Sequence, residues 1–224
     1  MAKAKAASQQ PAAEPAPLVW PSLPPPPRPL RLDSPTDGLI LIDSFFSTKT
    51  RTAFVSALSA LRLQGPSAPK KGEATRTNDR FSVHDPAFAK ALWTKTGLAD
   101  ALQSLEGRNG RRARGLNPNI RCYRYGEGAF FGPHYDDDVH DPQTGWTTEW
   151  TLLVYLTGKE DGVVGGETAF YPTPSRRDNG PAVVPELVSG RALLHRHGQH
   201  CALHEGRRVE KGVKWVLRSD VFFG

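Results

Sequence analysis

Three residues in the second half of the chain have the types and spacing of a metal site. His134 and Asp136 are separated by one residue, and on a β-strand such side chains project from the same face, roughly 6 to 7 Å apart along the chain. A third ligand could come from His204, which precedes a Glu-Gly pair. Two histidines and one carboxylate form a facial triad that leaves positions open on iron(II). By itself, however, a His-x-Asp tripeptide is more often part of an ordinary surface or turn segment.

A lysine further along the chain supplies a second indication. Lys214 alternates in phase with Val216 and Arg218, so all three side chains would share one face of a strand. If that face is buried, the ammonium of Lys214 needs an anionic partner, because an unpaired buried charge is very costly. A dicarboxylate ligand would supply that partner.

The segments around these residues predict a mainly β domain. From about residue 119 onward, short apolar segments alternate with Gly, Pro and Asp turns, which is typical of strands. The earlier part of the chain has helical periodicity with two strand-like segments. We expect strands over 39–42, 76–83, 120–125, 130–136, 149–156, 167–171, 191–195, 201–204 and 214–223, and helices over 49–63, 87–94 and 99–105. This pattern favours an α+β, mainly β fold, in which N-terminal helices support a closed or double-sheet β-core.

Composition separates the N-terminus from the rest of the 224 residues. Half of the 20 prolines fall in the first 35 residues, so we expect a disordered Pro-rich tail over 1–36 and one domain over 37–224, with its β-core over about 119–224. The tail is either a solvated spacer or a ligand for a Pro-binding domain.

Net charge, cysteine content and the lack of long apolar segments limit the classes of protein to which this chain can belong. The net charge of +6 is spread along the chain and favours an acidic partner only weakly. Two cysteines are too few for a disulfide scaffold, and both are interpreted as buried small hydrophobes. No apolar segment suits a membrane span or a signal peptide, so we expect no membrane partner and a cytoplasmic or nuclear location, with the endoplasmic reticulum not excluded.

Six segments, taken in order, carry a family resemblance: 121–136, 151–156, 165–170, 190–194, 204–206 and 212–214. Together they resemble the prolyl 4-hydroxylase branch of the iron(II) and 2-oxoglutarate dioxygenases, from about residue 119 to the end. The resemblance implies a double-stranded β-helix, or jelly roll, with Fe(II), 2-oxoglutarate as cosubstrate, O₂, and ascorbate as reductant.

The same resemblance assigns roles to individual residues. It implies that His134, Asp136 and His204 bind Fe(II) and that Lys214 pairs with the distal carboxylate of 2-oxoglutarate. Further candidates for the cosubstrate are Tyr125, Tyr155 and Thr168, the two tyrosines being equally compatible with a β-barrel core. Arg218 matches a basic position that could orient substrate or cosubstrate, although a buried ion pair with Asp220 or Asp137 is the alternative. Arg76 and Arg80 lie where they could contact a peptide, and surface polarity explains them about as well.

Other histidines near the third ligand complicate its assignment. His195, His197 and His200 occupy a segment where the family usually has an apolar strand followed by a loop. Any of them could compete for the metal. Only His204, however, has both the Glu-Gly continuation and the correct step to Lys214.

The resulting expectation is a dioxygenase that hydroxylates a protein or peptide residue, most readily proline, and releases succinate and CO₂. One alternative is an oxidative demethylase of nucleic acid on the same iron site. The net charge and an Arg-rich loop at 108–114 allow it, but Lys214 stands where that branch would use arginine and no aromatic-basic patch is present, so a nucleic-acid partner is not expected. Another alternative is a non-catalytic β-barrel binding module.

Overall fold

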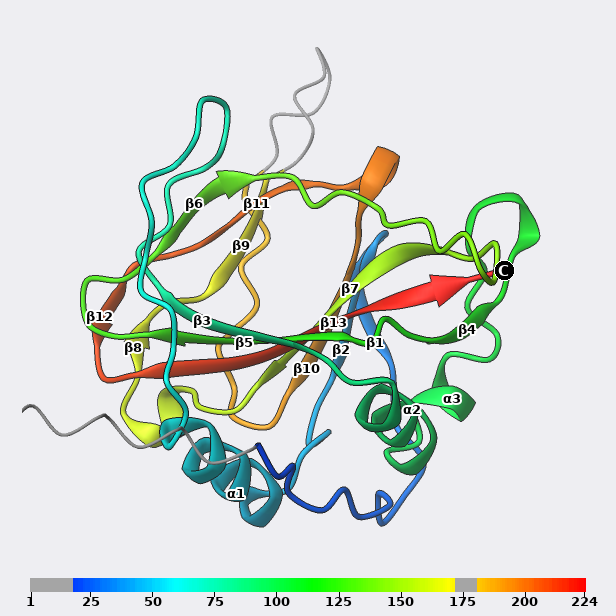
Figure 1. Cartoon of the computed structure of the whole chain (residues 1–224), viewed down its shortest axis with the longest axis horizontal. Helices are drawn as coiled ribbons and strands as arrows, with labels where there is room; N and C mark the ends of the chain where they lie inside the picture. Colours follow the sequence, from blue (N-terminus) through cyan, green and yellow to red (C-terminus); the bar gives the residue numbers. More distant parts are fainter. Residues whose placement is uncertain (1–17, 172–180) are drawn as a thin grey trace, which may run out of the picture.

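The computed structural model describes residues 18–171 and 181–224 of the chain (Figure 1). Antiparallel strands dominate these residues: β1 (Asp33–Thr36), β2 (Leu39–Ile42), β3 (Asp79–His84), β4 (Ala113–Leu116), β5 (Asn119–Tyr125), β6 (Phe131–His134), β7 (Thr147–Tyr155), β8 (Val164–Gly165), β9 (Thr168–Tyr171), β10 (Ala192–Arg196), β11 (Leu203–Gly206), β12 (Val209–Lys211) and β13 (Lys214–Phe223). The α-helices are α1 (Thr48–Ser59), α2 (Pro86–Lys95) and α3 (Leu98–Ala101).

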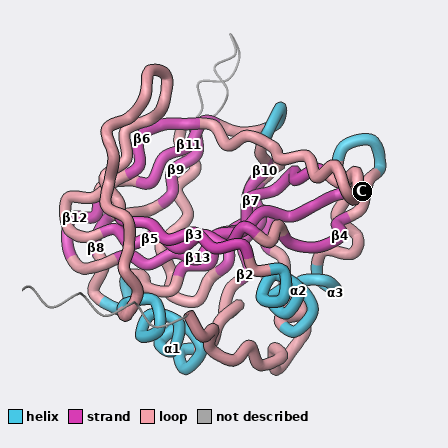
Figure 2. Tube along the Cα trace, in the orientation of Figure 1, coloured by secondary structure: helices cyan, strands magenta, loops and turns pink. Residues whose placement is uncertain are grey.

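The strands form two layers of unequal size. Within the described ranges, the larger sheet has eight strands in the order β1-β2-β10-β7-β13-β5-β3, with β4 paired to the C-terminal part of β13. A smaller sheet, β6-β11-β9, lies on the side of the larger sheet away from the helices, and β12 pairs with β8 at one end (Figures 1 and 2). The predicted α+β, mainly β fold is confirmed.

Local sequence explains where the two longer helices begin. Ser47 precedes α1, and its hydroxyl accepts a hydrogen bond from the backbone N–H of Thr50 at 3.2 Å. Asp85 precedes α2, accepts from the N–H of Phe88 at 2.8 Å, and is followed by Pro86 at the first helical position. These are favoured N-cap and N1 residues, because each satisfies or removes a backbone donor that the first turn leaves unpaired.

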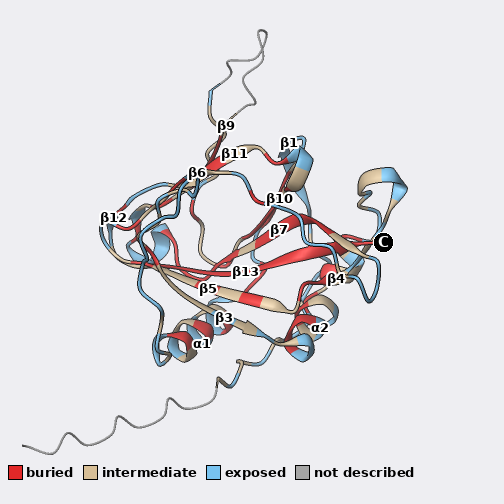
Figure 3. Ribbon diagram, turned by 45° about the horizontal axis from the view of Figure 1, so that its top comes forward, coloured by how far each residue is buried: buried red, intermediate tan, exposed pale blue. Residues whose placement is uncertain are grey.

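Both faces of the larger sheet are buried, which divides the core in two. On β2, Ile40 and Ile42 pack into the cluster shared with the helices, whereas Leu39 and Leu41 pack into a second cluster on the other face. Figure 3 shows the resulting buried strands at the centre of the molecule. Such two-sided burial accounts for the continuous apolar sequence of this strand.

The same alternation on β13 decides which side chains face the space between the sheets. Trp215 and Leu217 pack with the helices, and Val216 packs in the second cluster. Lys214 and Arg218 share the phase of Val216, and both are buried. The predicted shared phase of these three residues is therefore confirmed, and the face that they share is buried.

Several element boundaries differ from the sequence prediction. The helix expected over 49–63 ends at Ser59, and the residues after it form a turn and a backbone bridge between Gln64 and Arg80. Leu61 and Leu63 still pack against the core, so they extend the apolar pattern without extending the helix. The helix expected over 99–105 is only one turn long, and β1, β4, β8 and β12 were not expected.

The predicted tail boundary at residue 36 also requires correction. Trp20 stacks on Phe88 of α2 with ring centroids 3.9 Å apart, and its indole N–H donates to Asp85 at 2.8 Å. Residues 33–36 form β1, which pairs with β2. The segment from residue 18 onward is therefore packed against the domain, whereas residues 1–17 of the predicted tail lie outside the described residues.

Among the described helices, none combines the length and the apolar character that a membrane span would need.

We expect Trp20→Ala to lower the free energy of unfolding by about 2 kcal/mol, because it removes the stacked ring and leaves Asp85 without its indole donor. Urea unfolding followed by circular dichroism measures this loss. Val19→Ala is the matched control, since the Val19 side chain is 78% exposed. Equal stability of the two variants would show that this segment does not contribute to the domain.

Candidate active site

Strand pairing brings the two candidate histidine ligands together. His134 on β6 lies directly opposite His204 on β11 in the antiparallel register, and their ring centroids are 4.2 Å apart. Directly opposed residues on one sheet face have adjacent side chains, so the register alone makes this contact. The two histidines are far apart in sequence. The sequence predicted that they meet at one site, but it did not predict the register that pairs their strands.

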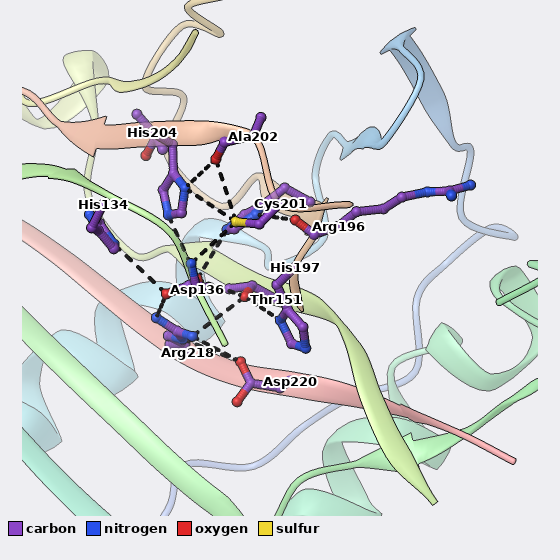
Figure 4. Close-up of polar contacts among 12 residues, drawn as sticks. His134, Asp136, Thr151, Arg196, His197, Cys201, Ala202, His204, Arg218 and Asp220 are labelled. Carbon is purple, nitrogen blue, oxygen red and sulfur yellow. Dashed lines mark hydrogen bonds and ion pairs between the residues drawn. The ribbon is translucent and has the colours of Figure 1, made fainter. Parts of the chain in front are cut away.

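Asp136 completes the group just beyond the end of β6. Its carboxylate oxygens lie 3.7 Å from Nε2 of His134 and 3.7 Å from Nε2 of His204 (Figure 4). The backbone N–H of Asp136 donates to Sγ of Cys201 at 3.2 Å, and its carbonyl accepts from Gly198 N–H at 2.9 Å. These two bonds attach the segment after β6 to the segment before β11.

The hydrogen bonds on the far side of each imidazole decide which nitrogen is free. Nδ1 of His134 lies 2.8 Å from the carbonyl of Gly132, and Nδ1 of His204 lies 3.0 Å from the carbonyl of Ala202. A carbonyl can only accept, so both Nδ1 atoms carry the proton and both Nε2 atoms present a lone pair. Two lone pairs directed at one carboxylate are the donor set that a divalent cation requires.

Charge and burial keep this donor set in its metal-binding form. Burial lowers the pKa of His134 to about 4 and also lowers the pKa of His204, so both rings are neutral. Burial alone would raise the pKa of Asp136, but the Arg218 guanidinium overcomes it, and the pKa is held well below its usual range. Neutral imidazoles and an ionised carboxylate fit a bound Fe(II) ion.

Arg218 anchors Asp136, which favours the buried ion pair over a substrate contact. Its Nη1 donates to Oδ1 of Asp136 at 3.0 Å, and its Nη2 lies 3.2 Å from Oδ1 of Asp220. The proposed alternative partner Asp137 is not part of this pair; Asp136 and Asp220 are. Burial alone would lower the pKa of the Arg218 guanidinium, but these two carboxylates outweigh burial and raise that pKa. Arg218 therefore positions Asp136, and a contact of Arg218 with substrate or cosubstrate stays a prediction.

Lys214 lies at the other end of the same interior. It stands opposite Tyr125 in the β13–β5 register, with its Nζ 4.9 Å from the centre of the Tyr125 ring and 5.4 Å from that of Tyr155. The Nζ is buried and donates to the carbonyl of Gly166 at 2.6 Å, and the described residues give it no carboxylate partner. A buried ammonium in this state fits the carboxylate of an anionic ligand.

The glycine beneath Lys214 is required by the close packing there. Gly166 has φ +77°, and a Cβ at this position would lie 2.9 Å from the side chain of Val209. A larger residue would therefore displace either the backbone carbonyl that receives Lys214 or the β12 strand. The sequence interpretation of Gly165-Gly166 as a turn permitting close backbone approach agrees with this geometry.

Tyr155 and Thr168 form a hydrogen-bonded pair beside Lys214. The Tyr155 hydroxyl and Thr168 Oγ1 are 2.7 Å apart, and burial raises the pKa of Tyr155 to about 12. Burial also raises the pKa of Tyr125. Both phenols are therefore neutral hydrogen-bond donors at physiological pH, and they lie where the sequence expectation put residues bordering a cosubstrate.

One internal pocket connects the two ends of the site. Its lining combines the three metal candidates with the cosubstrate candidates and Arg218, in the set Tyr123, Tyr125, Phe131, His134, Asp136, Leu153, Thr168, His195, His204, Gly206, Lys214, Val216 and Arg218. Tyr155 reaches this set through its bond to Thr168. The structure thus brings together every residue expected at the metal and the cosubstrate.

An open cleft of about 980 Å³ adjoins this pocket and shares His134 and Asp136 with it. Arg76 and Arg80 line the cleft, and the Arg76 guanidinium lies 5.7 Å from the centre of the Phe131 ring. The loop before β3 forms one wall, because Thr75 accepts a hydrogen bond from the N–H of Gly132 at 2.8 Å. Both arginines therefore lie outside the pocket, on the route to it.

Sequence reasoning missed the contributions of Thr151 and Cys201 to this site, and it named His195 only as one of three histidines that could compete for the metal. Thr151 donates to Oδ2 of Asp136 at 2.9 Å, and the thiol of Cys201, interpreted only as a small hydrophobe, accepts from Asp136. His195 stands opposite Thr151 in the β10–β7 register and points into the same interior. The sequence could predict which neighbours of His195 share its face of the strand, but it could not predict that this strand pairs with β7.

Comparison with known proteins agrees with this geometry. Residues 120–219 match the 2OG-Fe(II) oxygenase superfamily. The predicted resemblance is thereby confirmed, and Fe(II) and 2-oxoglutarate are the metal and cosubstrate of this superfamily. The candidate site is that of a 2OG-Fe(II) oxygenase, an oxidoreductase. No curated protein matches the sequence.

Solved structures of prolyl hydroxylases share the fold at low sequence identity. The viral collagen prolyl hydroxylase of Paramecium Bursaria Chlorella virus-1, in its 2OG complex, is 18% identical with a TM-score of 0.54, covering 83% of this chain and 96% of that one. A Pseudomonas putida prolyl-4-hydroxylase is 16% identical with a TM-score of 0.55, covering 82% and 91%. A Trichoplax adhaerens prolyl hydroxylase in complex with a hypoxia inducible factor peptide fragment is 17% identical with a TM-score of 0.56, covering 84% of both chains. The predicted jelly-roll fold is confirmed.

We expect the affinity for 2-oxoglutarate to fall above about pH 8, since burial lowers the pKa of Lys214 to about 8 in the free protein. A deprotonated amine cannot pair with a carboxylate, so affinity should fall up to about tenfold for each further pH unit. Calorimetric titration of the Mn²⁺-loaded protein between pH 7 and pH 10 measures this.

Lys214→Arg provides the control, because a guanidinium remains charged over the whole range. Its affinity should be nearly independent of pH, whatever its absolute value. A parallel decline in both proteins would assign the pH dependence to another group.

Proposed function

We propose that this 2OG-Fe(II) oxygenase hydroxylates a prolyl residue in a protein or peptide, converting 2-oxoglutarate and O₂ to succinate and CO₂. The observation that carries the proposal is the open cleft of about 980 Å³ that reaches His134 and Asp136. A cleft of this size and openness suits an extended chain better than a small organic acid. The similar solved structures include several prolyl hydroxylases, one of them with a peptide fragment bound.

In this proposal, different residues bind the metal, the cosubstrate and the substrate. His134, Asp136 and His204 would hold Fe(II), which supplies O₂ activation together with 2-oxoglutarate. Lys214 would hold the remote carboxylate of 2-oxoglutarate, with the neutral phenol of Tyr125 beside it. The buried walls exclude water from this end, whereas the substrate approaches from the open cleft, so cosubstrate and substrate reach the metal residues from different sides.

Electrostatics in the cleft favour a peptide over a nucleic acid only moderately. The charged residues of this lining are the cations Arg76, Arg80, Arg121 and Arg218 and the anions Glu73, Asp136 and Asp137. The described lining therefore has no continuous basic track of the kind that follows a phosphate backbone. Oxidative demethylation of a nucleic acid is accordingly an outcome to be tested rather than a second proposal.

The deciding experiment compares two substrate classes with one enzyme. Iron-loaded protein, prepared without oxygen, receives 2-oxoglutarate, ascorbate and O₂, with either a library of proline-containing peptides or methylated single-stranded oligonucleotides. We expect peptide-stimulated succinate release and a peptide mass increased by one oxygen atom. His204→Ala should lose the activity by at least about a hundredfold, since one of three metal ligands is gone. Stimulation by the oligonucleotides, with methyl loss, would replace the proposal with the demethylase.

Substitutions in the cleft separate substrate binding from cosubstrate chemistry. We expect Arg80→Gln to raise the KM for a peptide substrate severalfold, since Arg80 lines the cleft and not the internal pocket. The slow succinate release that occurs without peptide should remain as in the unmodified protein. Arg62→Gln is the control, because Arg62 lies outside both linings. If Arg80→Gln changed the affinity for 2-oxoglutarate instead, the assignment of the cleft to substrate would be wrong.

A further inference from the structure

A third histidine has the same arrangement as the two metal-ligand candidates. Nδ1 of His195 lies 3.1 Å from the carbonyl of Arg196, and its Nε2 lies 3.5 Å from Oδ2 of Asp136. His134 and His204 likewise direct Nδ1 to a backbone carbonyl and Nε2 to this carboxylate, at 3.7 Å each. The three imidazoles therefore surround Asp136 in equivalent ways.

The Nε2 atom of His195 is buried and has no hydrogen-bond partner among the described residues. His195 is 2% exposed, and its Nε2 is one of four buried side-chain polar atoms in the described residues without a hydrogen bond. With the proton on Nδ1, the Nε2 lone pair faces a carboxylate oxygen that also only accepts. Two buried acceptors in this position repel each other unless a cation lies between them.

A neighbouring buried histidine shows that the interior can satisfy an imidazole fully. Nδ1 of His197 lies 2.9 Å from the hydroxyl of Thr151, and its Nε2 lies 3.0 Å from the hydroxyl of Thr148. Each hydroxyl can either donate or accept, so neither nitrogen is left over. His197 is a structural histidine, and His195, on the same strand end, is not satisfied in this way.

His195 also shares a second group of candidate ligand atoms with His204. Ligand atoms of His195, Cys201 and His204 all lie within 4.8 Å of one another, as do those of His134, Asp136 and His204. The thiol of Cys201 is engaged with the backbone of Asp136 and Ala202, which leaves the imidazole as the free donor. The ring centroids of His195 and His204 are 4.5 Å apart, close to the 4.2 Å between His134 and His204.

We propose that His195 is an additional metal ligand, so that three histidines and Asp136 hold the ion when 2-oxoglutarate is absent. Four protein ligands leave two positions of an octahedral ion, whereas 2-oxoglutarate requires two and O₂ one more. Coordination by His195 therefore belongs to the resting site and ends when all three positions are needed. This inference concerns the metal and does not depend on the identity of the substrate.

The number of coordinated imidazoles can be counted directly. In the Co²⁺-loaded protein without 2-oxoglutarate, each ligated histidine that keeps its Nδ1 proton gives one strongly shifted proton resonance that disappears in D₂O. We expect three such resonances in the unmodified protein and two in His195→Phe. Two resonances in the unmodified protein would overturn the proposal, and this result does not depend on whether any variant folds.

Metal affinity provides the second measurement. Calorimetric titration of the metal-free protein with Co²⁺ should show about tenfold weaker binding for His195→Phe, with circular dichroism confirming its fold. His200→Gln is the control, since His200 is exposed and should change affinity by less than about twofold. Equal affinity in His195→Phe and the unmodified protein would exclude His195 as a ligand. Weaker binding together with only two resonances in the unmodified protein would reduce His195 to a residue that positions Asp136, which also contradicts the proposal.

Discussion

The buried carboxylate of Asp136 is the interaction on which the rest of the site depends. An ionised carboxylate in this interior would be very unfavourable by itself, and Arg218 and Thr151 stabilise it from two strands of the larger sheet. The backbone of the same residue is held by the segment before β11. One side chain thus ties the small sheet to the large one, and the histidines only acquire their shared target once this carboxylate is in place.

Burial on both faces of the larger sheet makes this arrangement possible. The helices cover one face, so the alternate side chains of β13 and β2 are mostly apolar there. The opposite face is then free to present charged groups into a closed space, where Lys214, Arg218 and Asp220 are all buried. A sheet with one face in water could not enclose two cations in this way, because solvent would screen and hydrate them.

The sequence predicted those parts of the site that follow from strand periodicity. The two-residue spacing of His134 and Asp136, and the shared phase of Lys214 and Arg218, follow from the alternation of side chains along a strand, and they hold in the structure. What depends on pairing between distant strands was not predictable from one sequence. The choice of Asp136 as the partner of Arg218 and the opposition of His195 to Thr151 both arise from registers that local pattern does not encode.

At the N-terminus, too, the composition did not reveal contacts with distant parts of the chain. Proline density predicted a disordered tail over 1–36, yet Trp20 and Leu30 pack against the helices and Asp33–Thr36 forms β1. A segment that cannot form a hydrophobic core by itself can still pack against the core of the domain, and only the tertiary structure shows that contact.

The position of Lys214 and Arg218 on a single strand gives the site a fixed length. The step from Lys214 to Arg218 is four residues along β13, which at the rise of an extended strand is about 13 Å. The ammonium of Lys214 and the guanidinium of Arg218, which holds Asp136, are therefore separated by one uninterrupted strand in the centre of the sheet, with no loop between them. With the residue roles proposed above, a dicarboxylate longer or shorter than 2-oxoglutarate would fit this interior only if its own conformation changed or if β13, which is paired on both sides, moved.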